Sequence, residues 1–420
     1  MGEAMATKYV LIGNSAASLA AVDGIRKHDK DGEITIINRE EGPAYSRVAL
    51  PYYVAGEMTL ADLLIRQKPD YAKVGVSLVE KENVAAIDPA SKKVELESGK
   101  KIEFDKLLVG TGSETTVPPI QGLNQVPHHF LWTLDDAVGM KKATEKAQTA
   151  VVIGGGFIGM LAAEALRKLK IKLVIVEMAP ILLPQLLDEG AGKRFLQAVR
   201  DEGVLVKTGV LVSALAKKNG SIEVTLNDGD TFTVDMAVVA TGVRPNVRCL
   251  QNGAVTLNKG VLVNEYLATN HPNIFAAGDV AETKDFLSDD RSIYAIWPTA
   301  IDQGRAAGAN MASAKQAYPG SLGMNVVELF NVTLAQLGRF REGPGDDVKM
   351  LSKREESLYR KVVVDKDGTL VGAVYLGDEN GVAEMGVIHS AIKRREKWQG
   401  FKDGRPPKFT YASVMHQVPR

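Results

Sequence analysis

Short runs of consecutive apolar residues recur through the first half of the chain. Such runs are typical of strands that are buried on both faces of a parallel sheet. They are residues 9–12, 107–109, 151–153, 173–176 and 237–239. After residue 153, apolar residues instead recur three and four positions apart, which predicts a helix with one buried stripe. That stripe is Ile158, Leu161, Ala162, Ala165, Leu166 and Leu169. The alternation of strands and helices predicts an α/β fold.

A glycine-rich turn joins one of these strands to the helix that follows it. Gly154, Gly156 and Gly159 form the pattern G-x-G-x-x-G directly after residues 151–153. The first glycine of this pattern turns the chain, the second lets a pyrophosphate approach the backbone, and the third lets helix and strand pack closely. Glu177 ends the next strand, where an acid is expected to accept the hydroxyl groups of an adenosine ribose. Together these features predict a Rossmann-like dinucleotide site.

The residues around Glu177 indicate which dinucleotide binds. A carboxylate there repels a 2′-phosphate, which needs an arginine or lysine close behind the acid. Met178, Ala179 and Pro180 follow instead, and the next basic residue is Lys193. The sequence therefore predicts NADH rather than NADPH.

The composition narrows the range of functions. A chain of 420 residues is longer than a single hydrophobic core usually supports, so we expect two or three domains. The 51 basic and 51 acidic residues balance, which gives no general argument for nucleic acid or an anionic membrane as partner. No apolar run is long enough to span a membrane, and residues 1–8 are too short and polar for a signal peptide, so we expect a cytoplasmic protein. The scattered histidines indicate no metal site.

A second, less regular turn follows residues 9–12. The positions of its three glycines are taken by Gly13, Ser15 and Ser18. The next strand, residues 34–37, is followed by Asn38, so the expected strand-end acid is displaced. Two interpretations stay open: Glu40 reaches a ribose, or Arg39 lies on an adenine.

The segments 84–112 and 211–242 repeat one design. Each contains short alternating strands joined at Ser-Gly or Asp-Gly turns, and then an apolar strand that ends in Thr-Gly. Each also follows one of the two glycine turns, so the same order of elements occurs twice. We therefore predict two nested dinucleotide domains, a discontinuous one from residues 1–115 and 243–321 and a second from 116–242. Residues 322–420 are predicted to form a small α+β domain.

These features resemble the two-dinucleotide flavoproteins, the FAD-dependent pyridine nucleotide–disulfide oxidoreductases. The third motif of that family is matched by residues 273–282, NIFAAGDVAE. The resemblance implies that Asp279 holds the ribityl chain of FAD and that Gly278 lets the backbone approach it. It also implies that a helix opening at Pro298 and Thr299 points its N–H groups at the flavin pyrimidine edge, where negative charge collects on reduction.

The resemblance implies two sets of cofactor-binding residues. The FAD set is Gly13, Ser15, Ala16, Ala17, Arg39, Glu40, Arg47, Val84, Thr111, Gly112, Gly278, Asp279, Pro298 and Thr299. The NADH set is Gly154, Gly156, Phe157, Ile158, Gly159, Glu177 and Gly242. Within the second set, Phe157 fits the aromatic residue that shields the flavin until NADH enters.

The loop of residues 44–58, AYSRVALPYYVAGEM, matches the family segment that runs past the flavin but lacks its redox cysteine. Val48 stands at that position, and the only cysteine, Cys249, is interpreted as a small buried residue. The loop instead resembles NADH-dependent rubredoxin and ferredoxin reductases and the flavoprotein portion of NADH nitrite reductases. Arg47, which is expected to contact FAD phosphate or flavin, and Glu164 are the candidate catalytic residues. A plain salt bridge is the alternative role for Glu164.

The C-terminal part resembles the corresponding domain of the same reductases. Residues 326–338, 359–364 and 371–377 predict strands around an Asp-Gly hairpin, and residues 381–395 predict a helix. The stretch 393–408 carries seven basic residues interleaved with Trp398 and Phe401. It is either a solvated tail or a docking strip.

The resemblance and the missing cysteine together predict an NADH oxidoreductase in which FAD passes electrons, without a thiol relay, to a redox protein. That acceptor would be a ferredoxin, a rubredoxin or an iron–sulfur subunit. Two alternatives stay open, an NADH oxidase that produces peroxide and a nucleotide-binding flavoprotein subunit of a larger redox complex. A homodimer and such a subunit are both compatible with the sequence.

Overall fold

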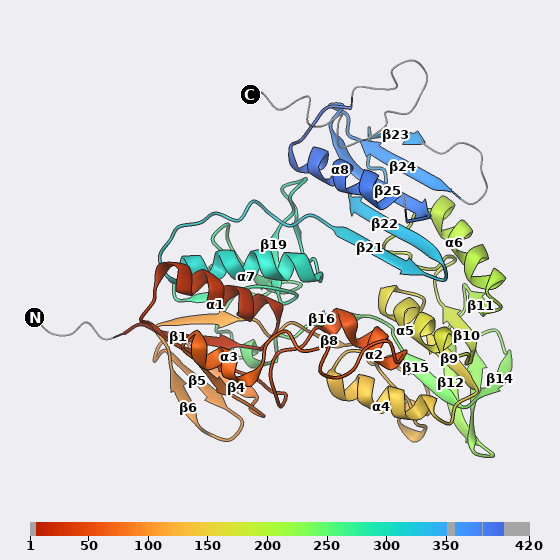
Figure 1. The fold of residues 1–420 in the computed structure, drawn as a ribbon, viewed down its shortest axis with the longest axis horizontal. Helices are drawn as coiled ribbons and strands as arrows, with labels where there is room; N and C mark the ends of the chain where they lie inside the picture. The colour runs from red at the N-terminus through yellow and green to blue at the C-terminus, as the bar shows by residue number, and fades with distance from the viewer. Residues whose placement is uncertain (1–5, 351–357, 380, 399–420) are drawn as a thin grey trace, which may run out of the picture. The chain divides into compact units, whose positions relative to one another are not determined.

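Figure 1 shows the computed structural model, which describes residues 6–350, 358–379 and 381–398. These residues form two compact units. The first unit takes its residues from Met1–Ala49, Met58–Glu114 and Val243–Leu322, and the second from Leu50–Glu57, Thr115–Gly242 and Gly323–Arg420. The divisions after Glu114, Gly242 and Leu322 fall at or next to the boundaries predicted from the sequence. However, Leu50–Glu57, predicted as part of the FAD-binding domain, is grouped with the second unit, and so is the predicted C-terminal domain. The division into three domains therefore stays a prediction.

A five-stranded parallel sheet forms the centre of the first unit, in the order β18-β7-β1-β2-β3. Its strands are β1 (Lys8–Ile12), β2 (Glu33–Ile37), β3 (Val76–Val79), β7 (Lys106–Val109) and β18 (Ile274–Ala276). The core of this unit is built on the apolar residues of these strands. Helices α1 (Ala16–His28) and α7 (Trp297–Met311) lie side by side, because Gly304 and Gly308 let their backbones approach closely (Figure 1).

Smaller elements complete the first unit. An antiparallel meander contains β4 (Val84–Asp88), β5 (Lys93–Leu96) and β6 (Lys101–Glu103). A second small sheet contains β17 (Val261–Leu262), β19 (Ala281–Lys284) and β20 (Arg291–Ser292), and β8 (Ser113–Thr115) pairs with β16 (Val243–Pro245). The short helices are η1 (Arg47–Ala49), α3 (Lys68–Lys73) and η3 (Arg248–Leu250).

A four-stranded parallel sheet forms the corresponding part of the second unit, in the order β11-β10-β9-β15. Its strands are β9 (Thr149–Ile153), β10 (Lys172–Glu177), β11 (Leu205–Thr208) and β15 (Met236–Val239). Its meander contains β12 (Val212–Lys218), β13 (Ser221–Leu226) and β14 (Thr231–Val234). The helices are α2 (Leu50–Val54), η2 (Leu123–Gln125), α4 (Leu134–Thr144), α5 (Phe157–Lys168) and α6 (Glu189–Asp201). None of the helices within the described ranges is both long and apolar enough to cross a membrane.

Both units contain the same arrangement of strands, which confirms the internal repeat predicted from the sequence. The order β3-β2-β1-β7 corresponds to β11-β10-β9-β15, and the meander β4-β5-β6 corresponds to β12-β13-β14. The correspondence extends to single hydrogen bonds. The N–H of Gly13 donates to the carbonyl of Ile37, and that of Gly154 to the carbonyl of Val176, each at 2.8 Å. Each unit therefore serves as an internal reference for the other.

The chain after residue 322 forms a five-stranded antiparallel sheet in the second unit, in the order β21-β22-β25-β24-β23. Its elements are β21 (Met324–Leu329), β22 (Val332–Gly338), β23 (Asp347–Met350), β24 (Tyr359–Val364), β25 (Leu370–Gly377) and helix α8 (Gly381–Lys393). The sequence did not predict β23. The basic stretch 393–408, either a solvated tail or a docking strip, continues past residue 398, and that part lies outside the described residues.

The buried stripe predicted for α5 was partly wrong. Ala162, Ala165 and Leu166 are buried as predicted, but Leu169 is exposed. Met160 and Ala163 are fully buried, although the pattern of one stripe did not include them. The reason is tertiary, because α5 packs against α2 and β21 as well as against its own sheet. A helix covered on two sides buries a wider face than one amphipathic stripe predicts.

Candidate dinucleotide and flavin sites

Both glycine turns have the backbone geometry that the motif requires. Gly13 and Gly154 have φ values of 105° and 107°, which side-chain-bearing residues rarely adopt. A Cβ on Gly13 would lie 2.2 Å from the carbonyl oxygen of Gly110, and one on Gly154 would lie 2.3 Å from that of Ala240. No side chain fits at either position. The space beside Gly156 is open, which leaves room for a pyrophosphate.

The third positions of the two turns differ in the residue that faces them. In the second unit a Cβ on Gly159 would lie 1.9 Å from the carbonyl oxygen of Gly154 and 3.3 Å from the Cβ of Ala240 on the facing strand end. In the first unit Ser18 occupies the helix position, and the facing residue is Gly110, whose added Cβ would lie 2.8 Å from the Oγ of Ser18. The side chain has thus moved from the strand to the helix. Serine at this position is compatible with close packing and does not argue against a nucleotide turn.

Three helices begin without a side-chain cap. The N-cap residues of α1, α5 and α7 are Ser15, Gly156 and Ile296, and none of these helices has an acid in its first turn. In contrast, Thr133 caps α4 and Asp188 caps α6 through their side chains. Free N–H groups at a helix start attract anions. The uncapped helices are those predicted to face FAD phosphate, NADH phosphate and the flavin, so the structure fits these groups.

Glu177 closes the second glycine turn at the end of β10. Its side chain is almost fully buried, and Met178 beside it is 72% exposed. The N–H of Gly155 donates to its Oε2 at 2.6 Å, and the N–H of Ala179 donates to its Oε1 at 2.7 Å. Because each carboxylate oxygen can accept more than one hydrogen bond, Glu177 can hold the turn and still accept a ribose hydroxyl. Its role toward the ribose stays a prediction.

The strand-end acid of the first unit is replaced by an amide. The carbonyls of Ile37 and Val176 accept equivalent turn hydrogen bonds, so the residues that follow them, Asn38 and Glu177, occupy the same position. Asn38 is buried and its Nδ2 donates to the carbonyl of Gly42 at 3.3 Å. The nearest acid is therefore Glu40.

Glu40 anchors the predicted flavin loop. It accepts hydrogen bonds from the hydroxyl of Tyr45 at 2.6 Å and from the guanidinium of Arg47 at 2.5 Å. Burial raises the pKa of Glu40, but the Arg47 charge and these hydrogen bonds outweigh it, so its pKa is lowered and the group is ionised at neutral pH. Arg39 lies 3.9 Å from the same carboxylate, measured from Nε to Oε1. The choice between Arg39 and Glu40 for the adenosine stays open.

The turn after β18 presents Asp279 as the motif predicts. The Oγ of Ser113 donates to its Oδ2 at 2.7 Å, and the N–H of Gly278 donates to the buried amide of Gln303 at 2.8 Å. Burial raises the pKa of Asp279, against the lowering effects of the Ser113 hydrogen bond and the Arg47 charge. A buried carboxyl of this kind is a strong acceptor for the hydroxyl groups of a ribityl chain.

Sequence reasoning missed Ser113 and Gln303, although each carried a signal. Ser113 directly follows the Thr-Gly end of a parallel strand, and such ends meet at one edge of the sheet. Gln303 is a polar residue one turn after Thr299 on the buried side of α7.

The predicted Thr111 donates through Oγ1 to the carbonyl of Asn246 at 2.6 Å. The space beside the predicted glycines Gly112 and Gly242 is open, and Val84 begins β4 half-buried.

The flavin loop offers no thiol. Val48, which stands at the position of the family's cysteine, lies in η1 and is 55% exposed. Cys249 is 5% exposed in the apolar core of the first unit, which confirms its interpretation as a small buried residue. Burial raises the pKa of its thiol to about 11, so it is protonated and unreactive at neutral pH.

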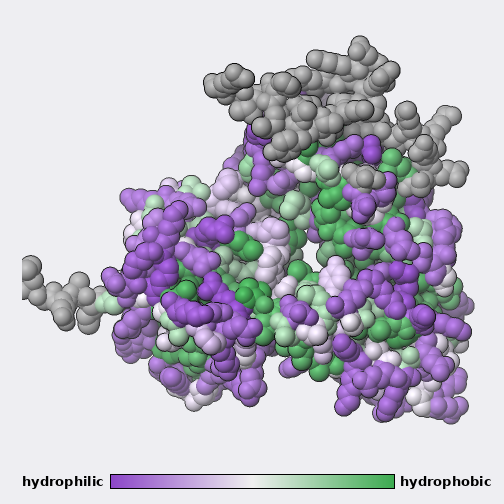
Figure 2. Space-filling view, in the orientation of Figure 1, coloured by the Kyte–Doolittle hydropathy of each residue, from purple (hydrophilic) through white to green (hydrophobic). Residues whose placement is uncertain are grey.

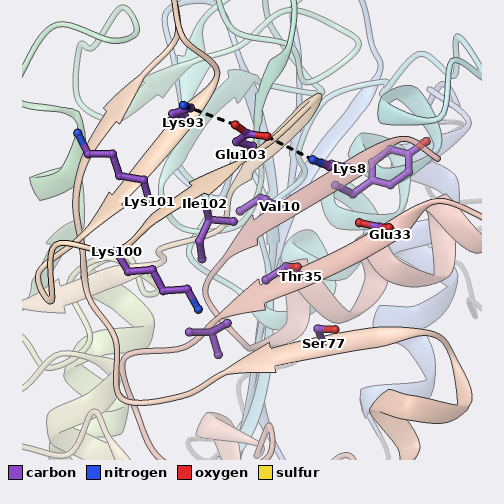
Figure 3. Close-up of a pocket in the computed structure, with 12 residues that line it drawn as sticks. Lys8, Val10, Glu33, Thr35, Ser77, Lys93, Lys100, Lys101, Ile102 and Glu103 are labelled. Atoms are coloured by element: carbon purple, nitrogen blue, oxygen red, sulfur yellow. Dashed lines mark hydrogen bonds and ion pairs between the residues drawn. The ribbon is translucent and has the colours of Figure 1, made fainter. Parts of the chain in front are cut away.

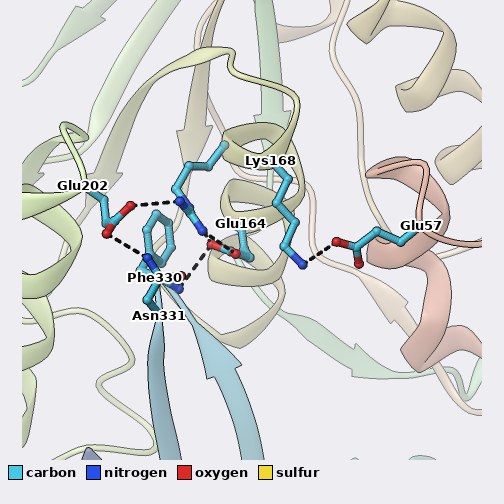
Figure 4. A network of polar contacts seen from close by, with 7 residues as sticks. Glu57, Glu164, Lys168, Glu202, Phe330 and Asn331 are labelled. Atoms are coloured by element: carbon cyan, nitrogen blue, oxygen red, sulfur yellow. Dashed lines mark hydrogen bonds and ion pairs between the residues drawn. The ribbon is translucent and has the colours of Figure 1, made fainter. Parts of the chain in front are cut away.

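Glu164 belongs to a polar network of the second unit (Figure 4). Arg167 donates from Nε and Nη2 to the two oxygens of Glu164, each at 2.9 Å, and from Nη1 to Glu202 at 2.9 Å. The N–H of Phe330, in the turn between β21 and β22, donates to Glu164 at 3.2 Å. One turn further along α5, Lys168 pairs with Glu57 at 2.6 Å. These contacts fit the alternative role of Glu164 as a salt-bridge partner. A catalytic role for Glu164 stays a prediction.

The nested sheets, the two glycine turns and the uncapped helices define an oxidoreductase with two dinucleotide sites. The model of the pyridine nucleotide-disulphide oxidoreductase family matches residues 7–304, and the chain belongs to that family. The predicted enzyme class, an NADH-dependent flavin oxidoreductase, is thereby confirmed, as are FAD and NADH as its cofactors. The missing cysteine sets this chain apart from members that use a thiol.

Two of the relatives that the chain matches are at least 30% identical to it over the aligned residues. NADH-dependent phenylglyoxylate dehydrogenase subunit epsilon of Aromatoleum evansii is 33% identical over 93% of this chain and 92% of its own length. The ferredoxin–NAD(+) reductase component of the p-cumate 2,3-dioxygenase system of Pseudomonas putida is 30% identical over 67% of this chain and 69% of its own. Among solved structures, an NAD-dependent persulfide reductase from A. fulgidus has a TM-score of 0.87 at 24% identity, over 97% of this chain and 83% of its own. That likeness confirms the fold.

Proposed function

We propose that the protein oxidises NADH through bound FAD and passes the electrons to a separate redox protein without a thiol relay. The observation that carries this proposal is the absence of a reactive cysteine, since Val48 occupies the loop position and Cys249 is buried and protonated. A reduced flavin therefore has no thiol within the chain to reduce. A small iron–sulfur protein of ferredoxin or rubredoxin type, or an iron–sulfur subunit, is the acceptor class we favour.

The names of the relatives support an acceptor outside the chain. One relative is the ferredoxin–NAD(+) reductase component of a multi-component system, and another is a subunit of an NADH-dependent dehydrogenase. Both names describe proteins that work with other polypeptides. A cytoplasmic location and a state as homodimer or as subunit of a larger redox complex are part of the same proposal.

The chain's own residues bind and orient the reactants. Bound flavin would supply the acceptor for the hydride of NADH and release the electrons singly. The turn at Gly154 and the start of α5 would hold the NADH pyrophosphate, and Glu177 would hold its adenosine ribose. Asp279 would hold the ribityl chain, and the first turn of α7 would stabilise negative charge at the pyrimidine edge. This division of tasks requires positioning and electrostatics, and no protein thiol.

Rapid mixing of the FAD-loaded protein with NADH tests the proposal. We expect NADH to bleach the flavin absorbance without oxygen, and an oxidised ferredoxin or rubredoxin to restore it faster than air-saturated buffer does. Fastest reoxidation by oxygen would replace the proposal with an NADH oxidase. Failure of NADH to bleach the flavin in the isolated chain would favour a subunit that turns over only within a complex.

A further inference from the structure

A cavity of about 540 Å³ lies between the central sheet and the meander of the first unit (Figure 3). Strands β1, β2 and β3 line one side, and β5, β6 and the turn between them line the other. Its lining includes the first residues of β1 and β2, whereas the glycine turn follows the carboxyl end of β1. The cavity is therefore distinct from the predicted FAD site. Its volume lies in the range of small-molecule pockets.

Two hydroxyl groups lie on the sheet side of this cavity. Val10 pairs with Thr35, and Thr35 pairs with Ser77, so the three residues form one row across β1, β2 and β3. Paired residues of parallel strands point to the same face. All three line the cavity, and Ser77 is exposed. A face that only packed against the meander would be expected to carry apolar residues instead.

The second unit shows that apolar alternative. Its equivalent row is Val151, Val174 and Leu205, by the register of β9, β10 and β11. Val151 and Val174 pack in one apolar cluster with meander residues such as Val224 and Phe232. The fold therefore does not require hydroxyl groups at this row, and Thr35 and Ser77 need another explanation.

The meander side of the cavity also differs between the units. Lys100 and Asp230 are equivalent, because their carbonyls accept the N–H groups of Leu96 and Leu226, each at 2.9 Å. Asp230 is neutralised by Lys207 at 2.7 Å. The side-chain ammonium of Lys100 has no hydrogen bond or ion pair to any residue that the structure describes, and this side chain points toward the sheet in Figure 3. At this position the cavity has a cation where the other unit has a neutralised acid, whereas at the start of β2 the cavity has the acid Glu33 where the other unit has Lys172.

The other cavity lysines are paired with acids. Lys8 and Lys93 both lie near Glu103, at 3.3 Å and 3.5 Å, and Lys101 lies 3.4 Å from Glu95. Their charges are therefore largely compensated by neighbouring carboxylates. This leaves Lys100 as the cavity lysine that a ligand can engage without breaking an ion pair.

We propose that this cavity binds a small organic phosphate ester. The ammonium of Lys100 and the hydroxyls of Thr35 and Ser77 supply three donors, which match the three terminal oxygens of a phosphate monoester better than the two of a carboxylate. Val10 and Ile102 supply apolar surface for the organic part. The site is independent of the proposed electron transfer.

Phenyl phosphate is a suitable probe, and its binding to the FAD-loaded protein can be measured by ³¹P NMR titration with excess NAD⁺ occupying the other phosphate site. We expect phenyl phosphate to bind and the neutral analogue benzyl alcohol to show no competition with it. Lys100→Asp and Thr35→Val, which introduce the residues of the second unit, should each weaken binding at least tenfold. Lys217→Asp, at an exposed lysine of the other meander, is the control and should leave the affinity unchanged.

The rate of flavin reduction by NADH should be unchanged in all three variants, which shows that they fold. Wild-type affinity in Lys100→Asp, or displacement of bound phenyl phosphate by benzyl alcohol, would overturn the proposal. Because Lys100 is exposed, we expect Lys100→Asp to fold normally. Its affinity for phenyl phosphate therefore tests the proposal even if Thr35→Val disturbs the sheet.

Discussion

Replacement of Glu177 by glutamine tests the predicted nucleotide site most directly. In the structure the carboxylate accepts the N–H of Gly155 at 2.6 Å and that of Ala179 at 2.7 Å. A glutamine side chain has nearly the same shape but only one acceptor oxygen. Its amide nitrogen would face one of these two N–H groups, so one backbone donor loses its partner, and the negative charge predicted to face the ribose is removed.

The expected magnitude follows from these two losses. A buried donor left without a partner costs about 1–3 kcal/mol, and a hydrogen bond to a charged group contributes about 1.5–3 kcal/mol. Because the turn can relax, we expect a net loss of NADH affinity of about 1.4–2.8 kcal/mol, which is tenfold to hundredfold. The affinity for NADPH should fall less, because the repulsion of the 2′-phosphate is relieved. The preference for NADH should therefore shrink.

The assay is anaerobic flavin reduction at a series of NADH and NADPH concentrations, from which the dissociation constant of each nucleotide is obtained. The matched control is Glu145→Gln, which removes an exposed acid of the same unit after α4. The control should leave both constants unchanged. Equal flavin reduction by NADH and NADPH in the wild-type protein would refute the assignment of Glu177. So would a glutamine variant that keeps the full preference for NADH.

Four further predictions concern three other residues. Asp279→Ala removes the predicted ribityl acceptor and should release FAD on a desalting column, whereas tight FAD in this variant would show that the third motif was misread. Cys249→Ser should be reduced and reoxidised at nearly wild-type rates, and two electrons should suffice per FAD in an anaerobic titration; consumption of four would contradict the absence of a thiol relay. Burial raises the pKa of the Cys249 thiol from its unfolded value of 9.0 to about 11. The buried thiol should therefore contribute fully to the free energy of unfolding below pH 9, and this contribution should be lost as the pH rises toward 11. Urea unfolding of the wild type and of Cys249→Ser across this pH range measures the loss. Glu164→Gln should lower the melting temperature while leaving the rate of flavin reduction by saturating NADH within about twofold, and a much larger loss of rate would indicate a catalytic role for Glu164.

The sequence by itself determined the class of fold and the position of the dinucleotide turns. Consecutive apolar residues can be buried only where both faces of a strand are covered, so the parallel sheets followed from the pattern. Gly13 and Gly154 need positive φ and tolerate no side chain, and only glycine meets both conditions. Composition also excluded an internal disulfide, because the chain has one cysteine, but the burial of Cys249, which argues against a relay through that single thiol, was decided by the tertiary structure.

Only the tertiary structure decided how the irregular positions work. Ser18 in the first turn faces Gly110, far away in sequence, whereas the equivalent Gly159 faces Ala240 in the other unit. Ser113 reaches Asp279 across a sequence separation of 166 residues, and Glu164 is held by the N–H of Phe330 across the same separation. Such contacts depend on which strand ends and turns come together in space, and no local pattern of apolar and polar residues records that arrangement.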